Sequence, residues 1–267
     1  MKKNKALIVV RVFIALAVWF LIYKGYEAFI DPMLEGKLPE IVRMIINSMV
    51  IPYTVGLGAC FLVLRGMEVP ERKSEVAVTP GVMAKAFLVQ TGLSMPVILI
   101  SNIILTILGV APRGMTADVI YGKYFIFYII LLLGYAPVVE EILFRKLFLD
   151  RLLVIGETGA IIVSAILFGL PHVYSQGISQ MFGTFLIGLV WAYVRVKTGK
   201  LWPGIILHIM FNLYGCYFAS FMTGKPITAM GFMFMSIILI PVVAVIILVK
   251  YFGTRETTNN SVNEGLS

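Results

Sequence analysis

The sequence has few charged residues, few cysteines and few polar stretches. Only 13% of its 267 residues are charged, against about 25% in soluble domains, so an ordinary soluble globular protein is excluded. Its two cysteines, Cys60 and Cys216, lie in apolar runs, which argues against a disulfide framework or a cysteine-rich metal site. The longest polar connection spans about 65–81 and leaves no room for an extended soluble domain.

Long apolar runs make up most of the chain. Hydrophobic residues account for 60% of it, and the mean hydropathy is +0.95. About 20 helical residues cross a bilayer core, and eight runs approach or exceed this length. They cover roughly 6–23, 41–64, 83–110, 120–139, 157–173, 179–196, 203–223 and 230–252. We therefore predict an all-α polytopic membrane protein, a bundle of about eight transmembrane helices around an internal cavity. The first run is read as a helix and not as a cleaved leader, because no small-residue cleavage site follows it.

Lysine and arginine are distributed unevenly between the two sets of loops. Fourteen lie at one set of span ends and five at the other, and the bias alternates through all eight spans. Because basic residues accumulate in cytoplasmic loops, we predict both termini in the cytoplasm, with the plasma membrane as the location. The net charge of +8 comes from short loops beside apolar spans and does not indicate a nucleic-acid partner.

The sequence shows no long linker between domains, so we divide the chain by the positions of its apolar spans and of the polar residues within them. We expect three N-terminal spans in 1–119, a core carrying the chemistry in 120–223, a last span in 224–252 and a disordered polar tail in 253–267. The connection 65–81 is expected to be mobile. His208 and Asn212 closely follow the basic loop 197–204, so we expect both in the cytoplasmic half of the membrane and a cavity that opens toward the cytoplasm.

Ionisable residues within apolar spans are the strongest functional signal. A charge at the bilayer centre costs about 2.5–3.5 kcal/mol on insertion scales. Glu140 and Glu141 interrupt one such run, and both histidines of the chain, His172 and His208, lie in others. Four-residue spacing pairs Glu141 with Arg145, and it also places His208 and Asn212 on a shared helical face. Glu140 lies about 100° around the helix from Glu141, so one carboxylate can bind Arg145 while the other faces elsewhere.

A length argument brings Glu140 beside His172. The turn signal between them lies at 156–159. Glu140 and His172 lie about 16 residues on either side of Gly156, or roughly 24 Å along two antiparallel helices. The argument requires the helix carrying Glu140 to continue through LFRKLFLDRLL, the sequence that follows it, instead of ending at the carboxylates.

These residue types suit amide hydrolysis. Glu140 would take a proton from water, His172 would hold that water, and His208 and Asn212 would donate to the oxyanion of the tetrahedral intermediate. Glu141 and Arg145 would support them. A zinc site formed by Glu140, His172 and His208, with Glu141 as base, is the minority alternative. The motif H-E-x-x-H is absent, and we favour a reaction without metal or another cofactor.

Three other readings stay open from the residues alone. A proton-coupled transporter also uses intramembrane Glu and His, although no internal repeat is visible. A non-catalytic membrane partner, such as an immunity protein, could keep the same fold. The polar residues could also be an interfacial ion pair and interhelical hydrogen bonds with no chemistry.

Three short motifs resemble those of one family of membrane peptidases. EEILFR at 140–145, FGLPH at 168–172 and HIMFN at 208–212 resemble E-E-x-x-x-R, F-x-x-x-H and H-x-x-x-N of the CAAX prenyl protease and bacteriocin-processing (CPBP) family, also called type II CAAX protease-like or Abi proteins. They occur in family order. The resemblance implies an eight-helix intramembrane endopeptidase with Glu140 as base and His172, His208 and Asn212 in the site. It implies a peptide or protein substrate within the lipid bilayer, and it leaves the substrate and the oligomeric state unassigned.

Overall fold

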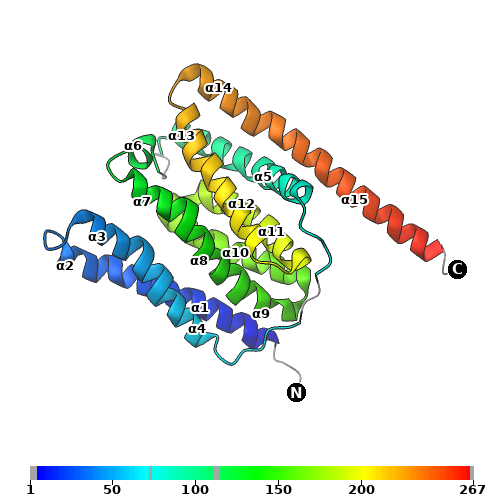
Figure 1. Ribbon diagram of the computed structural model, residues 1–267, viewed down its shortest axis with the longest axis horizontal. Helices are drawn as coiled ribbons and strands as arrows, with labels where there is room; N and C mark the ends of the chain where they lie inside the picture. Colours follow the sequence, from blue (N-terminus) through cyan, green and yellow to red (C-terminus); the bar gives the residue numbers. More distant parts are fainter. Residues whose placement is uncertain (1–4, 72–73, 111–114, 265–267) are drawn as a thin grey trace.

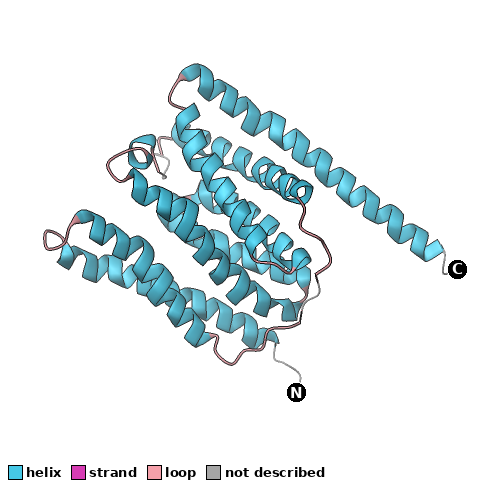
Figure 2. Ribbon diagram, viewed as in Figure 1, coloured by secondary structure: helices cyan, strands magenta, loops and turns pink. Residues whose placement is uncertain are grey.

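The computed structural model describes residues 5–71, 74–110 and 115–264, and in these ranges every regular element is a helix (Figure 2). Eight helical stretches are long and apolar enough to cross a membrane, which confirms the predicted number. They are Lys5–Leu34, Glu40–Val63, Pro80–Ile107, Phe125–Ile155, Glu157–Tyr174, Ile178–Thr198, Trp202–Met222 and Pro226–Thr254. The chain is therefore an all-α, multi-pass membrane protein.

Several spans contain short π-helical segments between α-helical ones. The α-helices are α1 (Lys5–Gly25), α2 (Asp31–Leu34), α3 (Glu40–Ile45), α4 (Leu57–Val63), α5 (Pro80–Ile107), α6 (Ala117–Ile120), α7 (Phe125–Ile129), α8 (Ala136–Glu141), α9 (Asp150–Leu152), α10 (Glu157–Gln176), α11 (Ile178–Thr198), α12 (Trp202–Asn212), α13 (Ala219–Met222), α14 (Pro226–Phe234) and α15 (Ile240–Glu264). Two π-helical segments, 130–135 and 142–149, flank α8. Pro137, near the start of α8, has no N–H to donate and accounts for the irregular hydrogen bonding before it.

The fourth span shows the largest difference from the expected boundaries. It was expected to end near 139, but it continues to Ile155, as the length argument for Glu140 and His172 required. The end of the last helix also differs from the expectation. Helix α15 continues through Glu264, whereas a disordered tail was expected from residue 253.

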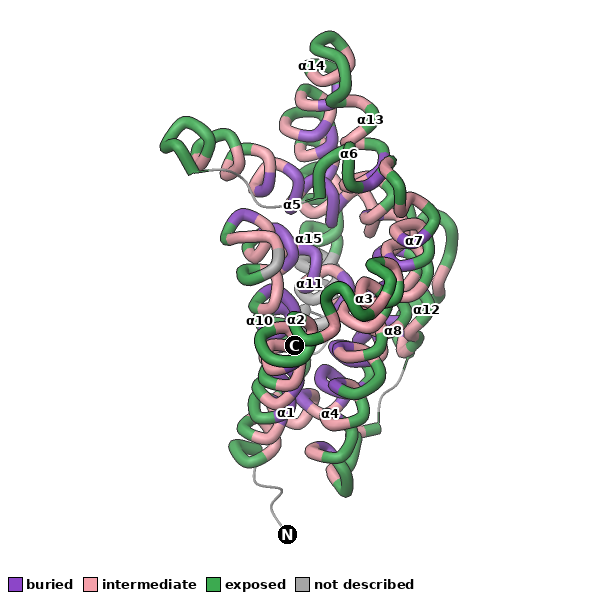
Figure 3. The backbone as a smooth tube through the Cα atoms, turned by 90° about the vertical axis from the view of Figure 1, so that its left-hand side faces the viewer, coloured by how far each residue is buried: buried purple, intermediate pink, exposed green. Residues whose placement is uncertain are grey.

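Packing places α11 at the centre of the bundle. It contacts both α10 and α5, and α15 lies along the other side of α5 (Figure 1). Buried side chains, among them Leu143, Phe148, Phe168, Trp191 and Leu207, form one continuous core. Exposed residues follow the outward faces of the helices (Figure 3), and large apolar side chains such as Leu21 and Phe29 among them suit contact with lipid.

One end of the bundle collects the start of α1, the connection 65–81, the turn before α10 and the end of α11; we call it the basic end. The Arg11 side chain donates to the carbonyl oxygens of Val63 and Arg65 there. Lys197 pairs with Glu75 at 2.8 Å and with Glu157 at 2.7 Å. The opposite end, which we call the far end, holds the Gly177 turn and the Met222–Pro226 turn.

The connection 65–81 is attached to the basic end in its described part. The Ser74 hydroxyl donates to the Thr198 carbonyl at 2.9 Å, and the Glu75 amide donates to the Lys197 carbonyl at 2.9 Å. Hydrogen bonds thus attach the described part of this connection to the end of α11, whereas a mobile loop was expected. Of the basic residues counted in the sequence, Lys2, Lys3, Arg72, Lys73 and Arg113 lie outside the described residues.

Candidate active site

Glu140 and Glu141 face different neighbours, as their helical spacing predicted. The Tyr53 hydroxyl donates to Oε1 of Glu140 at 2.5 Å. Oε2 of Glu141 lies 3.4 Å from Nε of Arg145, and both of these side chains are fully buried. The doubled glutamate therefore provides one carboxylate at the cavity and one in a buried ion pair.

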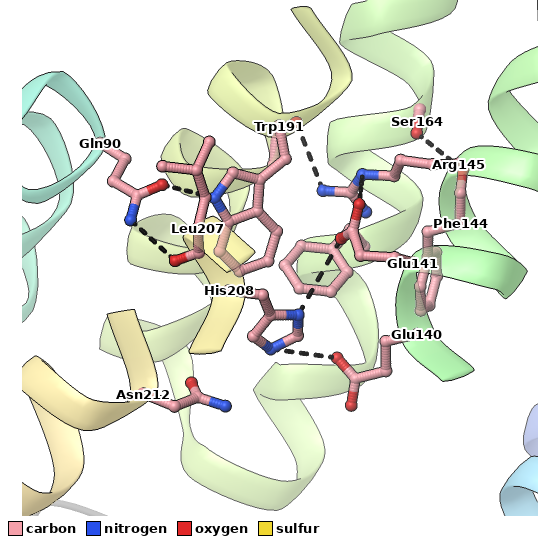
Figure 4. A network of polar contacts seen from close by, with 12 residues as sticks. Gln90, Glu140, Glu141, Phe144, Arg145, Ser164, Trp191, Leu207, His208 and Asn212 are labelled. Carbon is pink, nitrogen blue, oxygen red and sulfur yellow. Dashed lines mark hydrogen bonds and ion pairs between the residues drawn. The ribbon is translucent and has the colours of Figure 1, made fainter. Parts of the chain in front are cut away.

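His208 lies between the two carboxylates (Figure 4). Its Nε2 is 3.8 Å from Oε2 of Glu140, and its Nδ1 is 3.9 Å from Oε1 of Glu141. Both distances exceed a direct hydrogen bond, and a separation of this kind is often bridged by water. Neither carboxylate oxygen of Glu141 has a hydrogen-bond partner among the described residues, and the same holds for Nδ1 of His208.

Trp191 fixes the plane of the His208 ring. The two rings stack with centroids 4.3 Å apart and planes at 28°. The Trp191 indole N–H donates to Oε1 of Gln90 at 2.5 Å, and Nε2 of Gln90 donates to the Leu207 carbonyl at 3.0 Å. Gln90 thus connects the stacking partner of His208 to the helix that carries His208.

Arg145 is enclosed by aromatic rings. Its guanidinium carbon lies 4.5 Å from the Phe168 ring centroid and 5.4 Å from that of Trp191. Attraction between the cation and these ring faces helps to offset the desolvation of a fully buried guanidinium. Arg145 therefore lies behind the site and positions Glu141 without facing the cavity.

His172 and Asn212 complete the predicted set. His172 Nδ1 lies 2.9 Å from the Phe168 carbonyl oxygen. Because a carbonyl can only accept, Nδ1 carries the hydrogen, and Nε2 of a neutral ring remains an acceptor. Nδ2 of Asn212 donates to the Leu132 carbonyl at 2.8 Å. That bond uses one of two amide hydrogens and leaves the second available.

A cavity of about 370 Å³ brings the four residues together. Its lining includes Glu140, His172, His208 and Asn212, as well as Phe168 and Trp191. The volume lies within the range of about 300–1,000 Å³ that is usual for ligand sites. The structure thus gathers all four residues that the sequence selected, with Glu141 and Arg145 directly behind them.

Sequence reasoning missed two contributors to this site. Tyr53 lies in the second span, far from any motif, and its only signal was a hydroxyl in an apolar run. Trp191 lies in the apolar sixth span, where an aromatic ring is ordinary and gives no signal. Gln90 is a polar residue within the apolar third span, which is the local signal for its contact with Trp191.

A zinc site is a poor fit to these positions. Among the described residues, no three His, Cys, Asp or Glu side chains lie close enough to bind one metal ion. The reaction proposed below therefore uses no metal ion.

Comparison with known proteins identifies the segment that carries the site. No curated protein and no solved structure matches the chain significantly. Residues 122–214 match a family model described as type II CAAX prenyl endopeptidase Rce1-like. This segment contains Glu140, His172, His208 and Asn212, and the match agrees with the family that the three motifs resemble. Over residues 122–214 the chain is therefore similar to the Rce1-like family of the CAAX protease and CPBP type.

Proposed function

We propose that the protein is an intramembrane endopeptidase that hydrolyses a peptide bond in a membrane-associated peptide or protein. One observation carries the proposal: Glu140 and His208, both in the segment that matches an endopeptidase family, lie 3.8 Å apart and line the same cavity. We place the protein in the plasma membrane with both termini in the cytoplasm, in agreement with its basic loops.

Glu140 acts as the general base in this proposal. A water molecule between its carboxylate and Nε2 of His172 would have two acceptors for its hydrogens and would direct a lone pair at the substrate carbonyl. Glu140 takes the proton as the water attacks, which is a role worth about 10²–10⁴-fold in rate. Tyr53 holds the other carboxylate oxygen, so Oε2 is the oxygen that receives the proton.

His208 and Asn212 stabilise the oxyanion. The free amide hydrogen of Asn212 is a neutral donor, which avoids placing another charge in an apolar site. His208 donates from Nε2 when that atom carries a hydrogen. Glu141 lies on the Nδ1 side at 3.9 Å, a separation that a water molecule can bridge, so it would help to hold the orientation of the ring.

Glu140→Gln tests the assignment of the base. The substitution keeps the size of the side chain but removes its ability to take a proton. We expect the kcat for cleavage of an internally quenched peptide library by the purified protein to fall at least 100-fold. Glu75→Gln makes the same chemical change at the basic end and should leave the rate unchanged. Hydrolysis by the Glu140→Gln protein at near the wild-type rate would refute the role of Glu140.

Removal of metal tests the proposed metal-free reaction. We expect purified protein to keep its hydrolysis rate after incubation with a strong chelator and to hold far less than one equivalent of zinc by elemental analysis. Added zinc should not raise the rate. A rate that falls with chelation and returns with stoichiometric zinc would establish the alternative in which Glu140, His172 and His208 bind a metal.

A further inference from the structure

The cavity has a closed floor and an open mouth at opposite ends of the bundle. Trp191 and His208 at its floor are buried, whereas Thr116 and Thr223, which line its other extremity, are exposed. On the seventh span, Thr223 follows His208 by 15 residues, or about 22 Å of helix. Gln176, at the far end of α10, lies at the same extremity.

Buried ion pairs close the site toward the basic end. Glu141 and Arg145 lie directly behind the floor, and both are fully buried. Arg195 binds Asp150 through two hydrogen bonds of 3.2 and 2.6 Å farther in the same direction. Within the described chain, the residues that line the cavity extend from Trp191 and His208 toward the far end.

The mouth therefore opens at the end that is poor in lysine and arginine. The turns at Gly177 and at Met222–Pro226 belong to the set of loops that holds five of the counted basic residues, against fourteen at the other set. Basic residues are retained on the cytoplasmic side of a membrane. The expected opening toward the cytoplasm is thus at odds with the direction of the cavity, since the cytoplasmic side is the closed one.

The wall of the cavity is neutral and polar toward its mouth. Asn102, Gln176, Gln180, Ser220 and Thr223 offer hydrogen-bond donors and acceptors suited to a peptide backbone. Of the described lining residues, Glu140 is the only one with an acidic or basic side chain other than histidine. The described lining residues include no lysine or arginine that could bind a terminal carboxylate, so acidic substrate side chains would approach Glu140 along a wall without cationic side chains.

We propose that the cavity receives its substrate from the extracytoplasmic side, as an uncharged internal segment of an exported or outward-facing peptide. The substrate part of this inference rests on the proposed peptidase function, whereas the sidedness of the mouth does not. The two parts are measured separately.

Cysteine labelling measures the sidedness. Thr223→Cys marks the mouth and Lys200→Cys marks the basic end, both in a Cys216→Ser background because Cys216 lines the cavity. Cys60 is fully buried and stays in place. A membrane-impermeant anionic methanethiosulfonate should modify Thr223→Cys in intact cells at least five-fold faster than Lys200→Cys, and the order should reverse in inside-out vesicles. Any other pattern, equal rates included, overturns the proposed sidedness. The labelling requires no turnover and can be repeated in Glu140→Gln protein.

Blocking the mouth measures its use by substrate. Polyethylene glycol-maleimide on Thr223→Cys should lower cleavage of the internally quenched peptide library at least ten-fold, while the same group on Lys200→Cys should leave it unchanged. Peptides without acidic residues should show at least ten-fold higher kcat/KM than matched peptides carrying glutamate beside the scissile bond. Undiminished cleavage after modification at Thr223→Cys, or equal cleavage of both peptide sets, overturns the inference while the peptidase function stands. Absence of cleavage by the unmodified protein refutes the peptidase function instead.

Discussion

At the scale of single residues, the contact between Tyr53 and Glu140 is the most specific in the site. The hydroxyl donates to Oε1 at 2.5 Å, and it comes from a span outside the segment that matches the Rce1-like family model. A hydrogen bond to a charged group contributes about 1.5–3 kcal/mol. It holds one carboxylate oxygen and leaves the other to face His208, so in the proposed reaction Tyr53 would orient Glu140 without binding the substrate.

Tyr53→Phe should therefore lower kcat about ten-fold or more while KM changes little, because about 1.4 kcal/mol corresponds to a factor of ten in rate. Steady-state kinetics with the purified protein measure both constants. Tyr135→Phe is the matched control, since Tyr135 packs against Tyr53 with ring centroids 5.8 Å apart and its hydroxyl lies 3.5 Å from the Met49 carbonyl oxygen. Equal losses in the two variants would show that packing, and not the contact with Glu140, is responsible.

The site residues that could be predicted from the sequence share a high free-energy cost of insertion into the membrane. A carboxylate, an imidazole or a guanidinium in an apolar run is expensive, so Glu140, Arg145, His172 and His208 stand out without coordinates. Trp191 has no such cost, since an aromatic ring is ordinary in a membrane helix. Its role depends on stacking with His208, a contact between separate spans that the sequence does not encode locally.

At the scale of helices, the approach of α12 to α8 fixes the second carboxylate. A β-carbon added at Gly204 would lie 2.5 Å from Oε2 of Glu141 and 3.3 Å from its carboxyl carbon. Glycine allows the backbone of α12 to lie against the Glu141 side chain. The close approach also brings His208, one turn later on α12, between the two glutamates.

Gly204→Ala should displace Glu141 and lower both stability and activity. Overpacking in a filled interior costs about 1–3 kcal/mol, and a shift of Glu141 would move its partners Arg145 and His208. Thermal unfolding in detergent and kcat are the measurements. Gly134→Ala, on the span that carries Glu141, adds a β-carbon with no atom within 4 Å and should leave both unchanged. If Gly204→Ala behaves like this control, the contact with Glu141 does not constrain the helices.

Helix limits were harder to predict than helix number. Hydropathy falls after Glu140, which suggested an end near 139, yet the span continues to Ile155 because its polar residues find buried partners. Arg145 binds Glu141, and Asp150 binds Arg195. Such pairing depends on neighbouring helices, so the length of this span was recoverable only through the argument that linked Glu140 to His172.

At the scale of the whole molecule, the basic loops and the mouth of the cavity lie at opposite ends of the bundle. The basic end is closed by paired side chains, and the far end carries the mouth. The number of spans and their alternation followed from hydropathy alone, because lipid requires each crossing to satisfy its own backbone hydrogen bonds. The direction of the cavity did not follow, since it depends on how side chains from five spans fill the interior.

An even number of spans would place both termini on one side of the membrane, and the basic loops predict that this side is the cytoplasm. A green fluorescent protein fused after residue 267 of the full chain should therefore fluoresce, because it matures in the cytoplasm, and an alkaline phosphatase fused at the same position should be inactive. The same pair of reporters at the N-terminus should give the same pattern, which controls for the number of crossings. Phosphatase activity at both termini would invert the molecule and turn the mouth of the cavity toward the cytoplasm. Opposite results at the two termini would instead contradict the count of eight spans.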